Sequence, residues 1–173
     1  MKQIIPTSLS AILQLNSDLL LNCLDGLSEE TLQKRLNDCG NSIAFLVAHM
    51  IDARHFIASM LACAAPNPIG DSLANVKSID DCSALPPLSR LVSEWNFICS
   101  HLDQVFRGDM KVDLGSASPH SFPISDTSIL GGIAFLVQHD SFHLGQIAFL
   151  RRQCGQEPML YSKRDPSLTG SKA

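Results

Sequence analysis

Residues 133–155, IAFLVQHDSFHLGQIAFLRRQCG, decide the predicted fold, because this long apolar segment carries two histidines at helical spacing. Side chains four positions apart on a helix lie on one face with their Cβ atoms about 5–6 Å apart, so the imidazoles of His139 and His143 can bind one ion. The same face carries mostly apolar residues, which places the two rings in protein and not in water. Gln146 lies one turn beyond His143, where its amide can orient a ligand or a bound water.

A pair of histidines is too few for a tight metal site. Catalytic zinc-type sites take three protein ligands and leave one position for water or substrate, so a third donor must come from elsewhere in the chain. The best candidate is His49, which lies in the segment NSIAFLVAHMIDARHFIASML at residues 41–61. This segment also has the periodicity of a buried helix. The sequence therefore predicts a metal site made of His49, His139 and His143.

The order of these residues carries a resemblance to a known family. His49 in a second long helix, followed by His139-x-x-x-His143-x-x-Gln146 in a last long helix, resembles the DinB/YfiT-like superfamily of small metal-binding helical bundles. The stretch HDSFHLGQIAFLRRQCG is the most specific part, and the likeness covers residues 5–155. The resemblance implies an all-α four-helix bundle in up-down-down-up order, with the three histidines meeting at one end of its core.

The composition indicates a globular protein. A length of 173 residues suits one domain with a single core, and 45% hydrophobic against 17% charged residues favours a folded chain over a disordered one. We predict that residues 1–158 form this domain and that the polar segment 159–173 is a flexible tail. The net charge is -4 and no basic run occurs, so a nucleic acid partner is not expected.

The apolar segments are interrupted by polar residues. Gln14, Asn16 and Asp18 interrupt the first, and Asp52 with Arg54 the second, so no apolar run is expected to span a bilayer and no membrane partner is predicted. The N-terminal residues also lack the core of a signal peptide. The six cysteines are scattered without a CxxC motif, which favours free thiols. A cytoplasmic location is therefore predicted.

Helical periodicity predicts four long helices at residues 7–25, 42–65, 87–107 and 127–154, with a short extra helix at 28–36 between the first two. Asn41 or Ser42 is expected to cap the second long helix, and Asp126 or Thr127 the fourth. The polar connection of residues 66–86 is long enough for the third helix to run parallel to the second.

Two features of these helices predict additional contacts. The second long helix is apolar around nearly its whole circumference, which predicts burial on more than one side and a homodimer formed through this helix. Gly131, Gly132 and Gly145 reduce the helix propensity of the last helix, so we expect another helix or a ligand to approach closely there. Residues 109–126, which include His120, are expected to form a loop that covers the mouth of the bundle.

The two histidines of the last helix have other interpretations. They can be ordinary core residues that are hydrogen-bonded to their neighbours. The run His139-Asp140-x-x-His143 can also be compared with HExxH metalloproteases, where the second residue is a general base, but Asp140 is shorter than glutamate and no third ligand of that class follows. Ferritin-like di-iron chemistry needs Glu-x-x-His pairs, and the chain has none.

Several other polar residues are expected to lie outside the site. His101 belongs to the polar side of its helix, and His55 is expected at the surface or an interface. Asp52 lies three positions after His49, either near the site or at a solvated edge. Arg151 and Arg152 are expected to interact with the dipole at the end of the last helix.

The resemblance implies metal-dependent chemistry. Three neutral imidazoles leave a bound ion its full positive charge, so a thiol or water bound to it loses its proton near neutral pH. Relatives in the superfamily transfer low-molecular-weight thiols to electrophiles or isomerise a substrate with a thiol cofactor. A divalent-metal enzyme with thiol S-transferase-like activity on a small-molecule substrate is thus predicted. Metal-dependent hydrolysis and a non-enzymatic dimeric bundle are the alternatives, and the ligands suit zinc, nickel, iron or copper.

Overall fold

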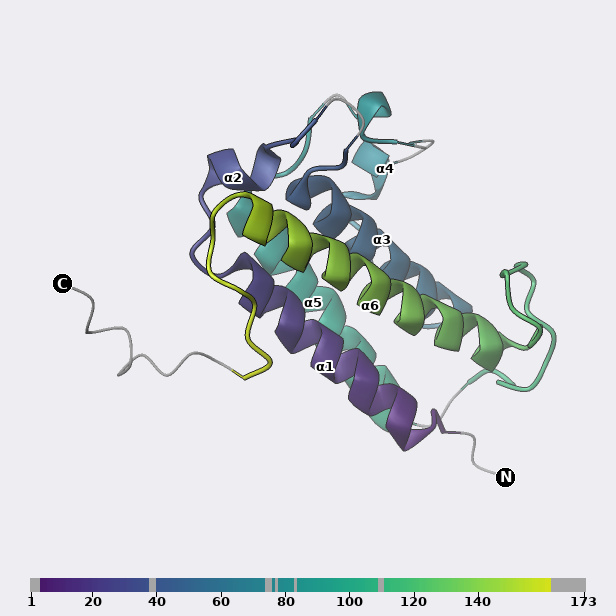
Figure 1. Cartoon of the computed structure of the whole chain (residues 1–173). Helices are drawn as coiled ribbons and strands as arrows, with labels where there is room; N and C mark the ends of the chain where they lie inside the picture. The colour runs from purple at the N-terminus through teal and green to yellow at the C-terminus, as the bar shows by residue number, and fades with distance from the viewer. Residues whose placement is uncertain are drawn as a thin grey trace.

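Four long helices build the molecule (Figure 1), namely α1 (Thr7–Leu24), α3 (Ile43–Met60), α5 (Leu88–Arg107) and α6 (Ile129–Gln153). The connections contain α2 (Glu29–Gln33), α4 (Gly70–Leu73) and a short 3-10 helix, η1 (Ile79–Asp81). The computed structural model describes residues 4–37, 40–73, 76, 78–82, 84–108 and 111–162. Within these ranges a single bridge, between Ala117 and Ser128, joins extended segments. The predicted all-helical bundle is therefore confirmed, with the short helix in its predicted place.

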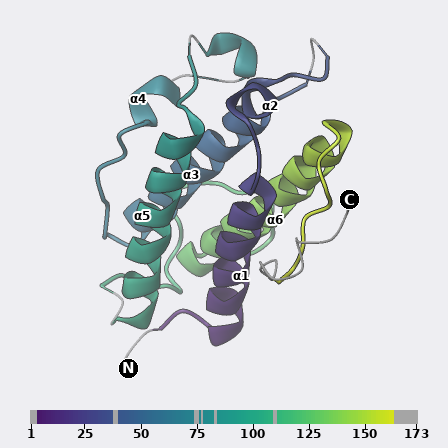
Figure 2. The ribbon, with the colours of Figure 1, turned by 90° about the vertical axis from the view of Figure 1, so that its left-hand side faces the viewer.

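The long helices pack in a ring in which α5 and α6 each lie between α1 and α3. Figure 2 shows α5 beside α3, and α1 beside α6. Asn16 in the middle of α1 bonds to Val137 of α6, and the end of α1 bonds to Arg151 near the end of α6, so these two helices run parallel. Helices α3 and α5 run in the opposite direction (Figure 1). This arrangement brings the first half of α3 next to the middle of α6, the two places that carry the predicted ligands.

Helix α3 is the central helix of the fold. It packs against α2, α4, α5 and α6, and most of its residues are buried. Despite Asp52 and Arg54, it is long and apolar enough to cross a membrane by length and composition, which differs from the expectation, but 72% of this window is buried inside the fold. The apolar circumference that predicted an interface with a second subunit is thus accounted for by contacts within the chain.

The end of α3 comes earlier than predicted. The helix begins after Ser42, whose hydroxyl accepts from the N–H of Phe45 as expected of a cap, but it ends at Met60 and not near residue 65. Ala62 adopts the left-handed conformation with a φ of 53°, and the N–H of Cys63 donates to the carbonyl of Ala58. These are the features of a Schellman turn, which usually contains glycine. The sequence does not indicate this end of α3, because alanine and not glycine occupies position 62.

The start of α6 also differs from the prediction by one residue. Ser128 is the cap, because its hydroxyl accepts from the N–H of Gly131. Asp126, one of the two predicted caps, instead accepts from the N–H of Ser128 and shapes the turn before the helix. The C-terminal end is as predicted, since Gly155 follows with a φ of 79°.

The predicted tail lies mostly outside the described residues. Residues 159–162 are described and run along α1, where the side-chain amide of Asn22 donates to the carbonyl of Leu160. Residues 163–173 are not among the described ones, so the boundary at residue 158 and the flexibility of the tail stay predictions. Five cysteines are described as free thiols, while Cys39 lies outside the described residues.

The glycines of α6 offer a matched pair of substitutions. A Cβ atom on Gly132 would overlap the ring of Phe122 and lie 2.8 Å from Cε of Met60, whereas one on Gly145 would meet no atom within 4 Å. We expect Gly132→Ala to lower the free energy of unfolding by about 1–3 kcal/mol through overpacking. Gly145→Ala should raise it by about 0.5–1 kcal/mol, because alanine is the better helix former. Urea unfolding followed by circular dichroism measures both, and a stabilising effect at both positions would contradict the close approach at Gly132.

Candidate metal centre

Three imidazoles from two helices converge on one point. His49 comes from α3, and His139 and His143 come from successive turns of α6. Nε2 of His139 lies 3.1 Å from Nε2 of His49 and 2.9 Å from Nε2 of His143. One ligand nitrogen from each ring lies within 4.8 Å of the other two. The three nitrogens are thus close enough together to bind a single ion of the zinc type, for which metal to nitrogen distances are about 2.0–2.1 Å.

The protonation of His143 is fixed by Gln146. Oε1 of Gln146 lies 2.6 Å from Nδ1 of His143. A carbonyl oxygen can only accept, so Nδ1 carries the proton of the neutral ring and Nε2 presents a lone pair to the other two histidines. A partner of this kind on the far nitrogen is typical of histidine ligands. Gln146, predicted to orient a ligand or water, therefore contacts the predicted ligand His143 itself.

The environment favours uncharged imidazoles. Burial is the largest cause that lowers the pKa of His49 and of His139, and the neighbouring imidazoles lower both pKa values further. The pKa of His139 falls to about 4, so this ring is neutral at pH 7. Nδ1 of His139 is buried without a hydrogen-bond partner. Three imidazole nitrogens that converge on one point form a donor set that fits a divalent transition metal.

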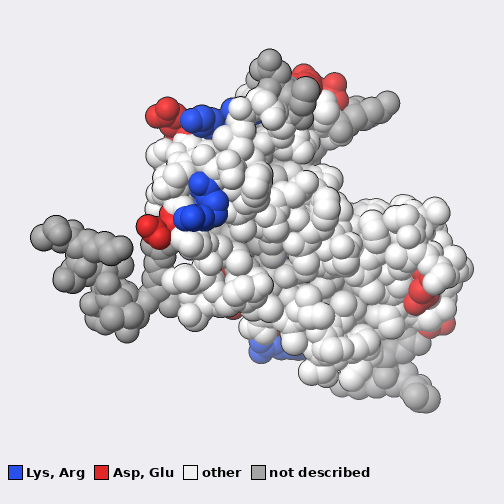
Figure 3. Space-filling model, in the orientation of Figure 1, with Lys and Arg blue, Asp and Glu red and all other residues white. Residues whose placement is uncertain are grey.

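Aromatic rings surround the three histidines. Phe45 stacks on His49 with ring centroids 6.3 Å apart, and Phe142 lies 5.3 Å from His143 in an edge-on arrangement. Phe135, one turn before His139 on α6, lies 6.3 Å from that ring. On the face shown in Figure 3, charged side chains are few and scattered, and the lysines and arginines of the described residues form no patch there. The rings that contact the three histidines are therefore apolar.

The loop before α6 closes one side of this aromatic surface. Phe122 lies 5.4 Å from Phe135 and 6.4 Å from Phe56, measured between ring centroids. His120 packs edge-on against Phe56 at 4.7 Å and does not reach the three histidines. The loop predicted to cover the mouth of the bundle thus lies one aromatic ring away from His139.

Asp140 is not placed to act as a general base. Its side chain has 0% exposure and forms an ion pair with Arg54, whose Nη2 lies 2.8 Å from Oδ2. Burial raises the pKa of the Asp140 carboxyl, and the guanidinium opposes that increase. The comparison with HExxH metalloproteases therefore fails, since the residue after His139 points into the core. Asp52 is not among the converging ligands, although it lies near enough for its charge to oppose the lowering of the His49 pKa, and its carboxylate accepts from the side-chain amide of Asn67 at 2.8 Å.

Three more polar residues lie outside the site, as expected, but make contacts that the sequence did not predict. His55 is buried against Phe97 and not at the surface, and Nε2 of His101 lies 2.7 Å from the carbonyl of Cys63. Arg151 is buried, and its Nη1 donates to the carbonyls of Cys23 and Asp25 at the end of α1. It therefore satisfies the free carbonyls of a neighbouring helix and not only those of its own.

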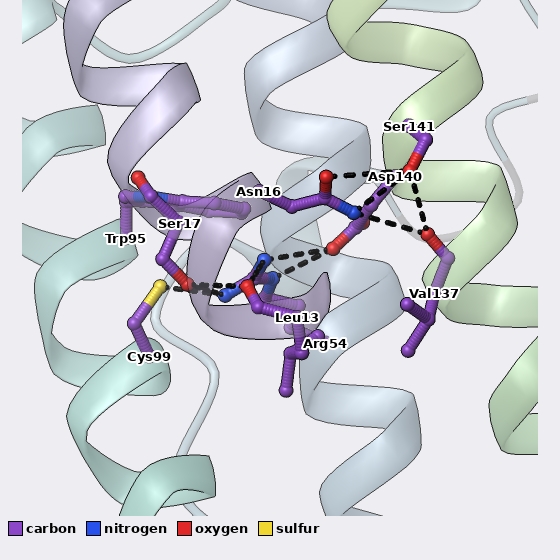
Figure 4. Close-up of polar contacts among 9 residues, drawn as sticks. All are labelled: Leu13, Asn16, Ser17, Arg54, Trp95, Cys99, Val137, Asp140 and Ser141. Atoms are coloured by element: carbon purple, nitrogen blue, oxygen red, sulfur yellow. Dashed lines mark hydrogen bonds and ion pairs between the residues drawn. The ribbon is translucent and has the colours of Figure 1, made fainter. Parts of the chain in front are cut away.

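The buried pair of Arg54 and Asp140 was missed in the sequence. Figure 4 shows Arg54 reaching from α3 toward Asp140 on α6, toward Ser17 on α1 and toward Cys99 on α5. A partial signal was present, because Asp140 is the only charged residue of α6 before Arg151, and Arg54 shares α3 with only one other charged residue, Asp52. Opposite charges in two core helices are consistent with pairing, since an unpaired buried charge is very costly, but the pattern alone is equally consistent with a solvated edge of each helix.

Comparison with known proteins adds one match. The family model described as mycothiol-S-transferase matches residues 8–156, a range that contains the three histidines and all four long helices except for Thr7, the first residue of α1. No curated protein sequence matches the chain.

Proposed function

Because this chain belongs to the mycothiol S-transferase family, a member of the DinB/YfiT-like superfamily, we propose that it is a metal-dependent enzyme that joins a low-molecular-weight thiol to a small electrophile. In this reaction the thiol loses its proton, a new bond forms between its sulfur and a carbon of the electrophile, and the leaving group departs from that carbon. The convergence of the Nε2 atoms of His49, His139 and His143 carries the proposal.

The protein's own residues would divide the work in the following way. His49, His139 and His143 hold a divalent ion through their Nε2 atoms, and Gln146 keeps His143 in the tautomer that leaves Nε2 free. The bound ion supplies a Lewis acid that brings the pKa of a thiol close to neutral pH. The rings of Phe45 and Phe142 limit the access of water to the histidines.

The three imidazole donors restrict the choice of metal to a small group of transition metals. We propose zinc, nickel or iron, because three imidazoles without a carboxylate suit these ions and not magnesium or calcium. A bound ion would keep a position for water or substrate, since structural zinc sites have four protein ligands and only three converge here among the described residues. This observation favours an enzyme over a bundle in which the metal is only structural.

Hydrolysis by the same ion is the less favoured alternative. A metal-dependent hydrolase of the metalloprotease type needs a carboxylate beside the ion as general base. The two nearest acids in the sequence, Asp52 and Asp140, are engaged with Asn67 and Arg54. Thiol transfer requires no such base in the protein once the thiol is ionised. We further propose that the protein works in the cytoplasm, since the family match and the composition suit an enzyme acting on small cellular thiols, while the homodimer through α3 stays a prediction.

The thiol dependence can be tested with protein purified without a metal-affinity tag. We expect the zinc-, nickel- or iron-loaded protein to convert a chlorodinitrobenzene in the presence of mycothiol or another small thiol, and activity to fall at least tenfold after chelation and to return when the ion is restored. The rate without thiol should equal the uncatalysed rate. Conversion that needs metal but no thiol would favour the hydrolase, and equal rates before and after chelation would contradict metal catalysis.

A further inference from the structure

The hydrophobic pattern does not by itself determine which faces of α3 and α6 meet. Helix α3 is apolar nearly all round, and α6 exposes two large rings while burying charges. Phe142 and Phe149 on α6 are 56% and 60% exposed, whereas Asp140 on the same helix is completely buried. A helix whose apolar residues are spread around its circumference can rotate at little cost in buried apolar surface. Another interaction must therefore determine the orientation of the helices that carry the histidines.

Arg54 makes contacts that fix this orientation from the centre of the bundle. Its Nε and Nη2 both lie within 2.9 Å of Oδ2 of Asp140. Its Nη1 lies 2.6 Å from Oγ of Ser17 and 2.8 Å from Sγ of Cys99, and its Cζ lies 3.9 Å from the centroid of the Trp95 ring. One side chain of α3 thus contacts the three other long helices (Figure 4). Any rotation of α3 or α6 would break charged hydrogen bonds inside the core, which are costly to lose.

The ion pair of Arg54 and Asp140 lies next to the metal centre on both α3 and α6. Asp140 follows His139 directly, so directing Asp140 toward the middle of the bundle turns His139, about 100° away, toward the groove between α3 and α6. His143 follows on the same face of α6. Arg54 lies five positions after His49 on α3 and meets α6 within a turn of the contact between His49 and His139. The ion pair and the three histidines therefore share one helix-to-helix interface.

We propose that Arg54 and Asp140 are positioning residues for the metal centre, which hold α3 and α6 in the rotation that brings the three Nε2 atoms together. This inference rests on the proposed function, because it concerns residues that would bind the metal. A buried ion pair can often be replaced by apolar residues without loss of stability. An apolar replacement of both residues can therefore keep the fold stable while removing the contacts that orient α3 and α6, so that a change in metal binding reports positioning and not stability.

The test is a cobalt(II) titration of the full chain carrying Arg54→Met and Asp140→Leu together. We expect this double variant to fold, to unfold in urea near the wild-type midpoint, and to bind cobalt(II) about 10- to 100-fold more weakly, the range found when partners of metal ligands are removed. The visible spectrum of bound cobalt(II) should also lose the intensity typical of a tetrahedral site. Cobalt affinity within twofold of the wild type in the folded double variant would overturn the proposal.

Two further variants complete the experiment. If the double variant does not fold, Asp140→Asn keeps the shape of the side chain and removes its charge, and it is expected to weaken cobalt binding at least tenfold. Unchanged affinity in that variant would again overturn the proposal. Leu91→Ala is the control, because Leu91 is buried on α5, which carries no ligand, and its loss should lower stability without changing cobalt affinity. Failure of the wild type to bind any ion would reject the proposed function itself and is therefore distinguishable from failure of the positioning role.

Discussion

Replacing His139 with alanine is expected to weaken the binding of zinc or cobalt(II) by roughly two to three orders of magnitude. His139 is the middle member of the cluster, since its Nε2 lies within 3.1 Å of Nε2 of both His49 and His143. Structural zinc sites with four ligands are worth roughly 10–16 kcal/mol, so one ligand contributes about 3–4 kcal/mol, and each 1.4 kcal/mol is tenfold in affinity. Competition with a chromophoric chelator measures the change.

The stability of the metal-free protein separates this prediction from the alternative of ordinary core histidines. Nδ1 of His139 is buried without a partner, so its removal deletes a desolvated polar atom together with the packing of the ring. We expect the free energy of unfolding of the metal-free His139→Ala variant to stay within about 1 kcal/mol of the wild type. If the three histidines serve only the core, by bonding to one another through their Nε2 atoms, the variant should lose stability and its metal affinity should not change.

His120→Ala is the matched control for that measurement. His120 is an exposed histidine of the loop before α6 and packs against Phe56, not against the three histidines. The His120→Ala substitution removes an imidazole, as His139→Ala does, from the same region of the molecule. Metal affinity should be unchanged in this variant. A comparable loss of affinity in both variants would mean that the ion binds wherever imidazoles are available and not at the cluster.

Local patterns predicted the long helices and placed two of the three clustered histidines on one face. The spacing of apolar residues in α5 gave its bounds almost to the residue, because its two ends are marked by Pro87 and Gly108. The histidines of α6 share a face by helix geometry alone. His49 required a packing argument across 90 residues, which the family resemblance supplied. The structure brings the three rings together, and their binding of a metal stays a prediction.

Features that depend on tertiary contacts could not be read from the sequence. The end of α3 rests on a left-handed alanine, a conformation that residue type does not favour. The pairing of Arg54 with Asp140 joins residues 86 positions apart, and a lone charge in an apolar helix is equally consistent with a solvated edge. Gly132 has a clear packing reason in Phe122, while Gly145, with the same effect on helix propensity, has none among the described residues.

The largest loss of stability is expected when Arg54 alone is replaced. Arg54→Met leaves the Asp140 carboxylate at 0% exposure without its cation, and breaking a buried pair in this way typically costs 3–5 kcal/mol. Folded domains are stable by only about 5–15 kcal/mol, so the variant should be close to unfolding at physiological temperature. For a chain of this length the melting temperature should fall by roughly 6–20 °C. Calorimetry of the metal-free protein measures the effect without interference from ligand binding.

Replacing an arginine of a surface ion pair with methionine provides the comparison for Arg54→Met. Arg107 pairs with Asp103 one turn away, with exposures of 72% and 46%, so Arg107→Met should cost no more than about 1 kcal/mol. Adding Asp140→Leu to Arg54→Met should recover most of the lost stability, because no charge is then left unpaired in the core. If the double variant stays as unstable as Arg54→Met, the cost lies in the lost contact of the guanidinium with Trp95 and Ser17 and not in the unpaired carboxylate. Recovery of stability would instead show that the charge of Asp140 requires Arg54.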